Sequence, residues 1–260
     1  MMEKRVERPF TKADWNSLVE LTRAQFKLID HNSILGFLWS FLGPLAMLAV
    51  TYAIFSARFG ENIPAYPLYL LVGIVMVNCF VNSTAQIMAS FYCAIPLMIN
   101  TTVRREIILA SHASISLYKF LLELLFCLVL SFFYGKFSPT MFVLALPIVL
   151  SFIVFILGAS AILSLANCFA RDVEHLWMLL SRLLFFVTPI FYELKDISSW
   201  ARQLVYWCNP VTPFVVSLRG LIMGRFDMTS YLHSLSLGVF FLALGIGAFW
   251  SLEDTAVERA

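Results

Sequence analysis

The stretch MFVLALPIVLSFIVFILGASAILSLANCF, residues 141–169, runs for 29 positions without a charged side chain. A helix rises about 1.5 Å per residue, and roughly 20 apolar residues suffice to cross the hydrocarbon core of a bilayer. The stretch is therefore long enough to cross a membrane as one helix. Exposing so much apolar surface to water is unfavourable, so the stretch must be shielded from water on most sides.

Similar stretches flank it on both sides along the 260 residues, which are 60% hydrophobic and only 13% charged. A soluble domain has about a quarter of its residues charged. The composition predicts an all-α membrane protein with six transmembrane helices. We expect a single transmembrane domain, with a cytoplasmic or interfacial segment (1–32), a membrane domain (33–252) and a cytoplasmic tail (253–260). The predicted spans cover about 34–55, 67–88, 107–134, 141–169, 175–192 and 231–252.

A helix over Thr11 to Ile29 is predicted ahead of the first span. Its apolar side chains, among them Leu18, Val19 and Phe26, recur at spacings of three and four and share one face. Thr11, followed three residues later by Asp14, is typical of a helix N-terminus. An amphipathic interfacial helix on the cytoplasmic membrane surface fits this pattern, and an ordinary soluble helix is the alternative.

Residues 195–230, between the fifth and sixth predicted spans, are too apolar for a plain loop. The segment breaks at residues 208–213 (CNPVTP), and each half is about ten residues, too short to cross a bilayer. Thr212 is expected to cap the second half, with Pro213 at its first position. A re-entrant helical hairpin fits this pattern, and a hairpin lying on the membrane surface is the alternative.

The distribution of Lys and Arg predicts the orientation. The N-terminal segment, the loops after spans two and four and the tail hold ten of them, against six in the other loops. Loops rich in Lys and Arg stay in the cytoplasm. Both termini are therefore predicted to be cytoplasmic.

Familiar catalytic motifs do not occur. The sequence has no G-x-x-x-x-G-K-[ST], no H-E-x-x-H and no G-x-S-x-G motif. Its four histidines are far apart and its five cysteines show no C-x-x-C spacing, so we expect neither a metal site nor catalytic residues. With a net charge of +2 and no basic stripe, nucleic acid is not an expected partner.

Three polar residues lie four apart in the second predicted span: Asn78, Asn82 and Gln86. This spacing puts them on one face of a helix. Polar side chains are costly inside a membrane and mark either helix packing or a path. The row predicts either a wall of a polar translocation path or hydrogen bonds between helices.

Four segments together resemble the permease subunits of ABC transporters that export O-antigen, capsule or teichoic acid. The first is SILGFLWSFLGP (33–44), with Gly36, Trp39 and Pro44. The second is YPLYLLVG (66–73). The third joins FARDV (169–173), with Arg171 and Asp172, to FVTPIFY (186–192), with Thr188 and Pro189. The fourth is NPVTP (209–213), followed by Arg219.

The resemblance implies a homodimer bound to two copies of a separate ATP-binding-cassette ATPase. ATP and Mg would be held by that partner, with no cofactor in this chain. The substrate would be a glycan on a polyprenyl diphosphate, exported across the bacterial or archaeal cytoplasmic membrane. The residues expected to couple to the ATPase are Pro96, Arg104, Arg105, Glu106, Arg23 and Lys27, although Arg104–Glu106 also suit a plain positive-inside anchor. An outer gate is implied for Trp200, Tyr206, Trp207, Asn209, Pro210, Pro213 and Arg219.

Two departures from the family pattern affect these expectations. The loop after span two keeps Arg105-Glu106 but lacks the family's proline, and Val215–Ser217 stand where an acidic residue is common before Arg219. The alternatives are an ABC exporter of a drug or lipid with the same fold, an intramembrane glycolipid-modifying enzyme, and an ion channel. An enzyme would need clustered acidic or histidine residues, and a channel would need a filter-like segment.

Overall fold

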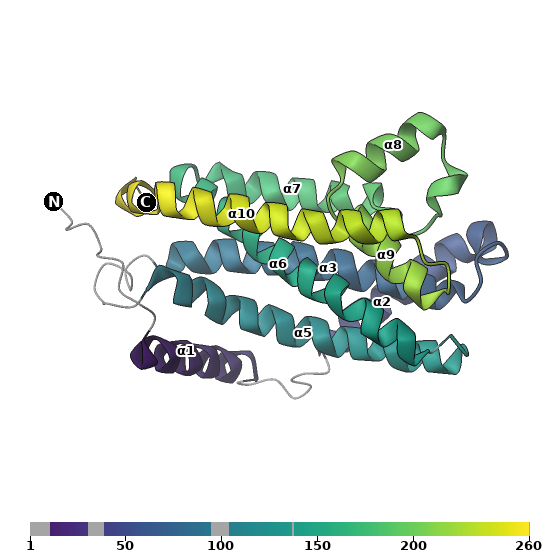
Figure 1. Ribbon diagram of the computed structural model, residues 1–260, viewed down its shortest axis with the longest axis horizontal. Helices are drawn as coiled ribbons and strands as arrows, with labels where there is room; N and C mark the ends of the chain where they lie inside the picture. The colour runs from purple at the N-terminus through teal and green to yellow at the C-terminus, as the bar shows by residue number, and fades with distance from the viewer. Residues whose placement is uncertain (1–10, 31–38, 95–103, 137, 260) are drawn as a thin grey trace.

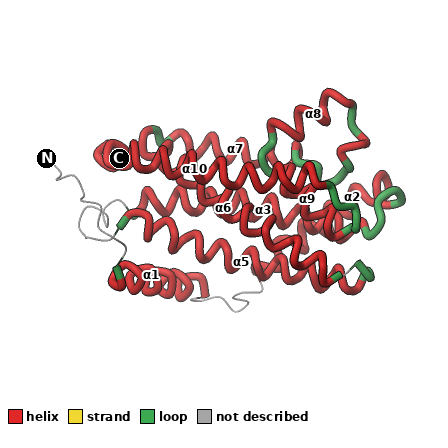
Figure 2. The backbone as a smooth tube through the Cα atoms, in the orientation of Figure 1, coloured by secondary structure: helices red, strands yellow, loops and turns green. Residues whose placement is uncertain are grey.

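The computed structural model describes residues 11–30, 39–94, 104–136 and 138–259. Within these ranges the chain is all-helical, and Figure 2 shows no strand in them. The helices are α1 (Lys12–Asp30), α2 (Trp39–Phe55), η2 (Ser56–Gly60), α3 (Tyr66–Cys93), α5 (Arg105–Phe133), α6 (Pro139–Phe169), α7 (Asp172–Val187), η3 (Leu194–Asp196), α8 (Ser199–Cys208), α9 (Thr212–Ile222) and α10 (Met228–Arg259).

The long helices lie side by side in one bundle (Figure 1). The C-terminal end of α10 and the beginning of α5 lie at the end of the bundle that also holds α1, which we call the proximal end. The opposite, distal end holds α8, α9 and the turn between α5 and α6. Both the first and the last described helix therefore have an end on the same side.

Helix α3 forms the centre of the bundle. Its side chains from Leu70 to Val77 are all buried, because α5, α6, α2, α7 and α9 pack around it. The other spans keep broad exposed apolar faces, such as Phe132 and Phe133 on α5. An apolar exterior around an apolar core is what a lipid environment requires.

Helices α6 and α10 make the most extensive contact in the bundle, and small residues allow it. A Cβ at Gly245 would lie 2.7 Å from the Cα of Gly158, and the Ser151 hydroxyl donates to the carbonyl of Ser234 at 3.0 Å. Small residues such as glycine and serine let the backbones of two membrane helices approach this closely.

Five helices are long and apolar enough to cross a membrane: Phe41–Gly60, Tyr66–Cys93, Glu106–Phe133, Val143–Phe169 and Met228–Leu252. They match predicted spans one to four and six. The fifth predicted span, 175–192, corresponds to α7, which ends at Val187 and has only 16 residues. Thr188 precedes Pro189 and is extended, because a residue before proline disfavours the helical conformation.

Other boundaries also differ from the sequence prediction. Helix α10 continues to Arg259, so the predicted tail at 253–260 is largely an extension of the last helix. Thr212 is the first residue of α9 rather than its cap, and its buried hydroxyl has no partner among the described residues. The predicted start of α1 is confirmed by the mutual bonds of Thr11 and Asp14, in which each backbone N–H donates to the other side chain.

Candidate functional site

Arg219, on α9, is buried at the distal end and connects three segments of the chain. Its Nε donates to the carbonyl of Tyr69 on α3 at 2.9 Å, and Nη2 donates to that of Ile190 at 3.0 Å. Nη1 donates to the carbonyl of Pro189. The last two carbonyls are available because α7 has already ended at Val187 and the chain that follows is not helical. The guanidinium thereby ties α9 to α3 and to the end of α7.

A glycine on α3 makes room for this guanidinium. A Cβ at Gly73 would overlap Nη2 of Arg219, so any side chain there would displace the arginine. The ring of Tyr69 covers the same group, with 3.7 Å between Cζ of Arg219 and the ring centroid. Such a cation–π contact stabilises a buried charge.

The break between α8 and α9 is attached to the same place. Nδ2 of Asn209 donates to the hydroxyl of Thr188 at 2.8 Å, and Oδ1 accepts from the N–H of Val211 at 3.0 Å. Asn209 and Thr188 are both buried. We call Tyr69, Gly73, Thr188, Pro189, Asn209 and Arg219 together the distal cluster.

Two tyrosines of α3 secure the chain that follows α7. The hydroxyl of Tyr66 donates to the carbonyl of Phe191 at 3.0 Å, and that of Tyr69 donates to the carbonyl of Tyr192 at 2.7 Å. Residues 188–192 therefore have much of their freed backbone paired with α3 and α9, as a membrane interior demands.

The sequence assigned these residues to separate groups, and the structure brings them together. Thr188 and Pro189 were expected to be structural, whereas Asn209 and Arg219 were expected at an outer gate. Tyr69 and Gly73 were not singled out, although both lie in the quoted segment 66–73. A glycine among bulky residues in a buried span was the signal that could have found them. No carboxylate of the described residues lies within ion-pair distance of Arg219, and carbonyls surround it instead.

The remaining residues expected at the gate do not join the distal cluster. Trp200 and Trp207 are 70% and 68% exposed on α8, whereas Pro213 is buried and Pro210 half-buried. The half-buried Tyr206 donates to the hydroxyl of Ser230 at the start of α10, at 3.0 Å. Helix α8 thus presents its tryptophans outward, as aromatic residues do at a membrane interface.

The three polar residues of α3 form the exposed side of an otherwise buried helix. Asn82 is exposed and Asn78 and Gln86 are half-buried, while Ser83 and Thr84 beside them are buried. The described residues offer no hydrogen bond to any of the three amides. We call Asn78, Asn82 and Gln86 the polar row. Its exposure leaves the amides available to water, substrate or another chain.

The residues expected to contact the ATPase lie at or near the proximal end, as far as the structure describes them. Arg104 precedes α5 and pairs with Glu106 at 3.5 Å. Arg23 pairs with Glu20 at 3.0 Å on the exposed side of α1, and Lys27 is exposed as well. Pro96 lies outside the described residues, and Arg105 begins α5 with its side chain not described.

Helix α1 packs along the beginning of α5. Gln25 donates from Nε2 to the hydroxyl of Ser111 at 3.0 Å, and the rings of Phe26 and Tyr118 meet edge to face with centroids 5.1 Å apart. The exposed charges of α1 therefore point away from the bundle.

The remaining motif residues are distributed over three elements. Gly36 lies outside the described residues, Trp39 begins α2 with its side chain not described, and Pro44 lies within α2. Arg171 precedes α7, donates to the hydroxyl of Tyr92 and lies over that ring, with 4.8 Å between Cζ and the centroid. Asp172 is exposed in the first turn of α7.

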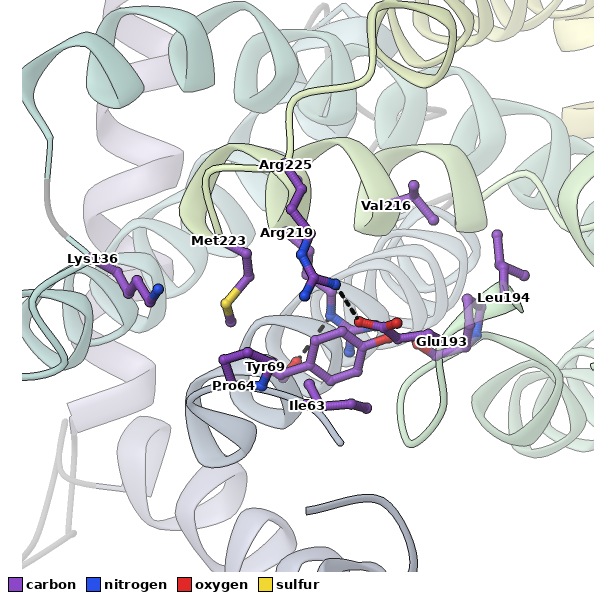
Figure 3. Close-up of a pocket in the computed structure, with 12 residues that line it drawn as sticks. Ile63, Pro64, Tyr69, Lys136, Glu193, Leu194, Val216, Arg219, Met223 and Arg225 are labelled. Atoms are coloured by element: carbon purple, nitrogen blue, oxygen red, sulfur yellow. Dashed lines mark hydrogen bonds and ion pairs between the residues drawn. The ribbon is translucent and has the colours of Figure 1, made fainter. Parts of the chain in front are cut away.

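A cavity of about 260 Å³ adjoins the distal cluster (Figure 3). Arg219, Arg225, Lys136 and Glu193 contribute its charged lining. Glu193 pairs with Arg225 at 2.9 Å and also with Lys195. A second cavity, of about 420 Å³, is almost wholly apolar and lies between α6, α7 and the α8–α9 break.

Comparisons with known proteins cover most of the chain. A family model described as ABC-2 type transporter matches residues 16–223. An O-antigen export system permease protein, RfbA, from Klebsiella pneumoniae is 28% identical over 243 residues, 93% of each chain. Its namesake from Myxococcus xanthus is 30% identical over 206 residues, 78% of this chain and 79% of the relative. The similarity thus extends over the bundle and the distal cluster together.

Proposed function

The chain belongs to the ABC-2 type transporter family, and from that premise we propose that it is the membrane subunit of an ABC exporter for lipid-linked polysaccharide. One observation carries the proposal: a protein named as an O-antigen export system permease matches this chain over 93% of the length of each. A match of that extent reaches far beyond one shared motif. The glycan is of the O-antigen, capsule or teichoic acid type.

The proposed topology has six crossings, with both termini in the cytoplasm. Five helices meet the length and composition of a span, and α7 with residues 188–192 supplies the sixth. Support comes from the common placement of α1 and the end of α10 at the proximal end (Figure 1). The excess of Lys and Arg in the N-terminal segment and the even-numbered loops favours the cytoplasm for that end.

Energy would come from a separate ATPase that docks at the proximal end. The sequence carries no P-loop, and the proximal surface offers Arg104, Glu106, Arg23 and Lys27. Complementary charges on two exposed surfaces steer the proteins together and fix the register in which they bind. Helix α1, with its charges turned away from α5, would lie at the cytoplasmic membrane surface.

The path would run between two copies of this chain. The polar row supports this arrangement, because three amides along a buried helix have no partner within the described protomer. Polar groups exposed at that depth need water or another polar surface. Helices α8 and α9, held by the distal cluster, would form a re-entrant hairpin that closes the outer end.

The direct test is reconstitution. The full chain and the ATPase that co-purifies with it are placed in proteoliposomes with a polyprenyl-diphosphate-linked glycan, and the appearance of the glycan on the opposite face is measured with a lectin. Movement with ATP and none with ADP is expected. ATP-independent movement, or covalent turnover of the glycolipid by this chain alone, would contradict the proposal. Movement of a drug or simple lipid instead of the glycan would favour the alternative exporter.

A further inference from the structure

Arg219 carries a buried charge with no carboxylate in direct contact, and Glu193 attracts it only from beyond ion-pair distance. The side chain is only 4% exposed, yet no acidic group among the described residues lies within 4.0 Å of its guanidinium. Three of its five N–H groups donate to carbonyls, which leaves two without a bond. An unpaired charge in such a place is costly, so a missing anion is the natural partner.

The adjoining cavity gathers further positive charge. Lys136, in the turn after α5, and Arg225, after α9, line it together with Arg219 (Figure 3). The only carboxylate among the lining residues is that of Glu193, which Arg225 and Lys195 already engage. Lys136 is half-buried, and its ammonium has no partner in the described ranges. Apolar side chains such as Ile63 and Val216 complete the walls and strengthen any charge–charge attraction inside.

The neighbours of these cations indicate the depth of the cavity in the membrane. Phe133 and Tyr134, three and two residues before Lys136, are 78% and 42% exposed, and Phe226, directly after Arg225, is 46% exposed. Exposed aromatic residues beside cations are typical of the headgroup level of a bilayer. The α5–α6 turn also marks where two apolar spans end.

We propose that this cavity binds the phosphate group of a membrane lipid at the distal face. The phosphate oxygens accept from the two unused N–H groups of Arg219 and from the ammonium of Lys136. Guanidinium and ammonium groups bind phosphate through short, charge-assisted hydrogen bonds. The inference goes beyond glycan export and holds whatever substrate the transporter moves.

Binding there would act on the distal cluster. The same guanidinium holds α9, α3 and the chain after α7, so an anion that neutralises it stabilises all three attachments. The lipid at the distal face would thus set how firmly the α8–α9 hairpin is held. A ligand that binds only the folded state raises the midpoint of thermal unfolding.

The experiment uses the full chain in nanodiscs. Thermal unfolding and lipid retention by native mass spectrometry are compared in phosphatidylcholine alone, in phosphatidylcholine with phosphatidic acid, and in phosphatidylcholine with inorganic pyrophosphate added. Phosphatidic acid is expected to raise the unfolding midpoint of the wild type. A response to phosphatidic acid alone identifies a lipid headgroup, whereas an equal response to pyrophosphate identifies a free phosphate as the source.

The decisive variant is Lys136→Gln, which removes one cation from a turn without touching the bundle core. Its affinity for phosphatidic acid is expected to fall about tenfold, as for the loss of one charge-assisted hydrogen bond. Lys136→Arg should restore it. Arg58→Gln is the matched control, since Arg58 is an exposed cation of the η2 turn that does not line the cavity.

Two results would overturn the proposal. One is retention of phosphatidic acid by Lys136→Gln at the wild-type level. The other is an equal loss in Lys136→Gln and Arg58→Gln, which would mean attraction to surface charge in general. Unfolding midpoints in phosphatidylcholine alone are the check that both variants are folded, so that neither result can be attributed to misfolding.

Discussion

The distal cluster and the polar row both place polar side chains in an apolar chain, and these side chains differ in where their partners lie. Asn209, Thr188 and Arg219 find carbonyl, hydroxyl and amide partners within the same protomer. Asn78, Asn82 and Gln86 find none among the described residues. A hydrogen bond made inside one chain holds that chain together. A polar group without a partner, on the exposed side of an otherwise buried helix, is available to water, substrate or another chain.

The largest expected effect comes from filling the space that Arg219 occupies. Gly73→Leu would expel the guanidinium and leave a buried charge without its contacts, which costs about 3–5 kcal/mol. Thermal unfolding in detergent measures it. Gly247→Leu is the control, because nothing lies within 4 Å of a Cβ built at Gly247 on α10. Equal stability of the two variants would contradict the structural role assigned to Gly73.

A matched pair of asparagines separates the two regions more directly. Asn209→Ala leaves the hydroxyl of Thr188 and the N–H of Val211 without partners and is expected to cost about 1–3 kcal/mol. Asn82→Ala should change stability by less than about 0.5 kcal/mol, as exposed substitutions do. Chemical or thermal unfolding of both variants in the same detergent decides the comparison. A reversed order would contradict it.

The polar row should matter for transport instead. Replacing Asn78, Asn82 and Gln86 together by Leu is expected to slow glycan movement about tenfold, equivalent to ~1.4 kcal/mol, while the unfolding midpoint of the protomer stays the same. Ser236→Leu, at an exposed position on α10, is the control for a polar-to-apolar change facing outward. An unchanged transport rate in the triple variant would contradict a role of the polar row in transport.

The smallest expected effect concerns the start of α10. Hydrogen bonds from Ser230 and Thr229 lower the pKa of Asp227 and cap the helix. Asp227→Ala should cost ~1 kcal/mol, a shift of about 2–4 °C in the unfolding midpoint. Because the folded pKa is lowered, the capping benefit is full above the ordinary value and is lost as the pH falls below about 4. A difference between wild type and variant that persists at lower pH would contradict this assignment.

Local pattern was enough for most of the bundle. Five spans follow from long apolar runs, and α1 follows from its periodicity and the Thr11–Asp14 pair. The boundary of α7 was missed because Thr188 and Pro189 end the helix in the middle of an apolar run, where hydropathy gives no signal. The continuation of α10 to Arg259 was missed for the opposite reason, since its last turns are polar but still helical.

The amino-acid sequence by itself determined that this chain is a helical membrane protein with the motifs of a polysaccharide-export permease. Apolar length and motif order are local properties, and they do not depend on how the helices pack. Only the tertiary structure decided that Gly73, Pro189 and Arg219, 30 to 146 positions apart, meet at one guanidinium. Carbonyl groups are the same at every position in a sequence. Which of them are left free to accept from a buried arginine depends on where helices end and cross.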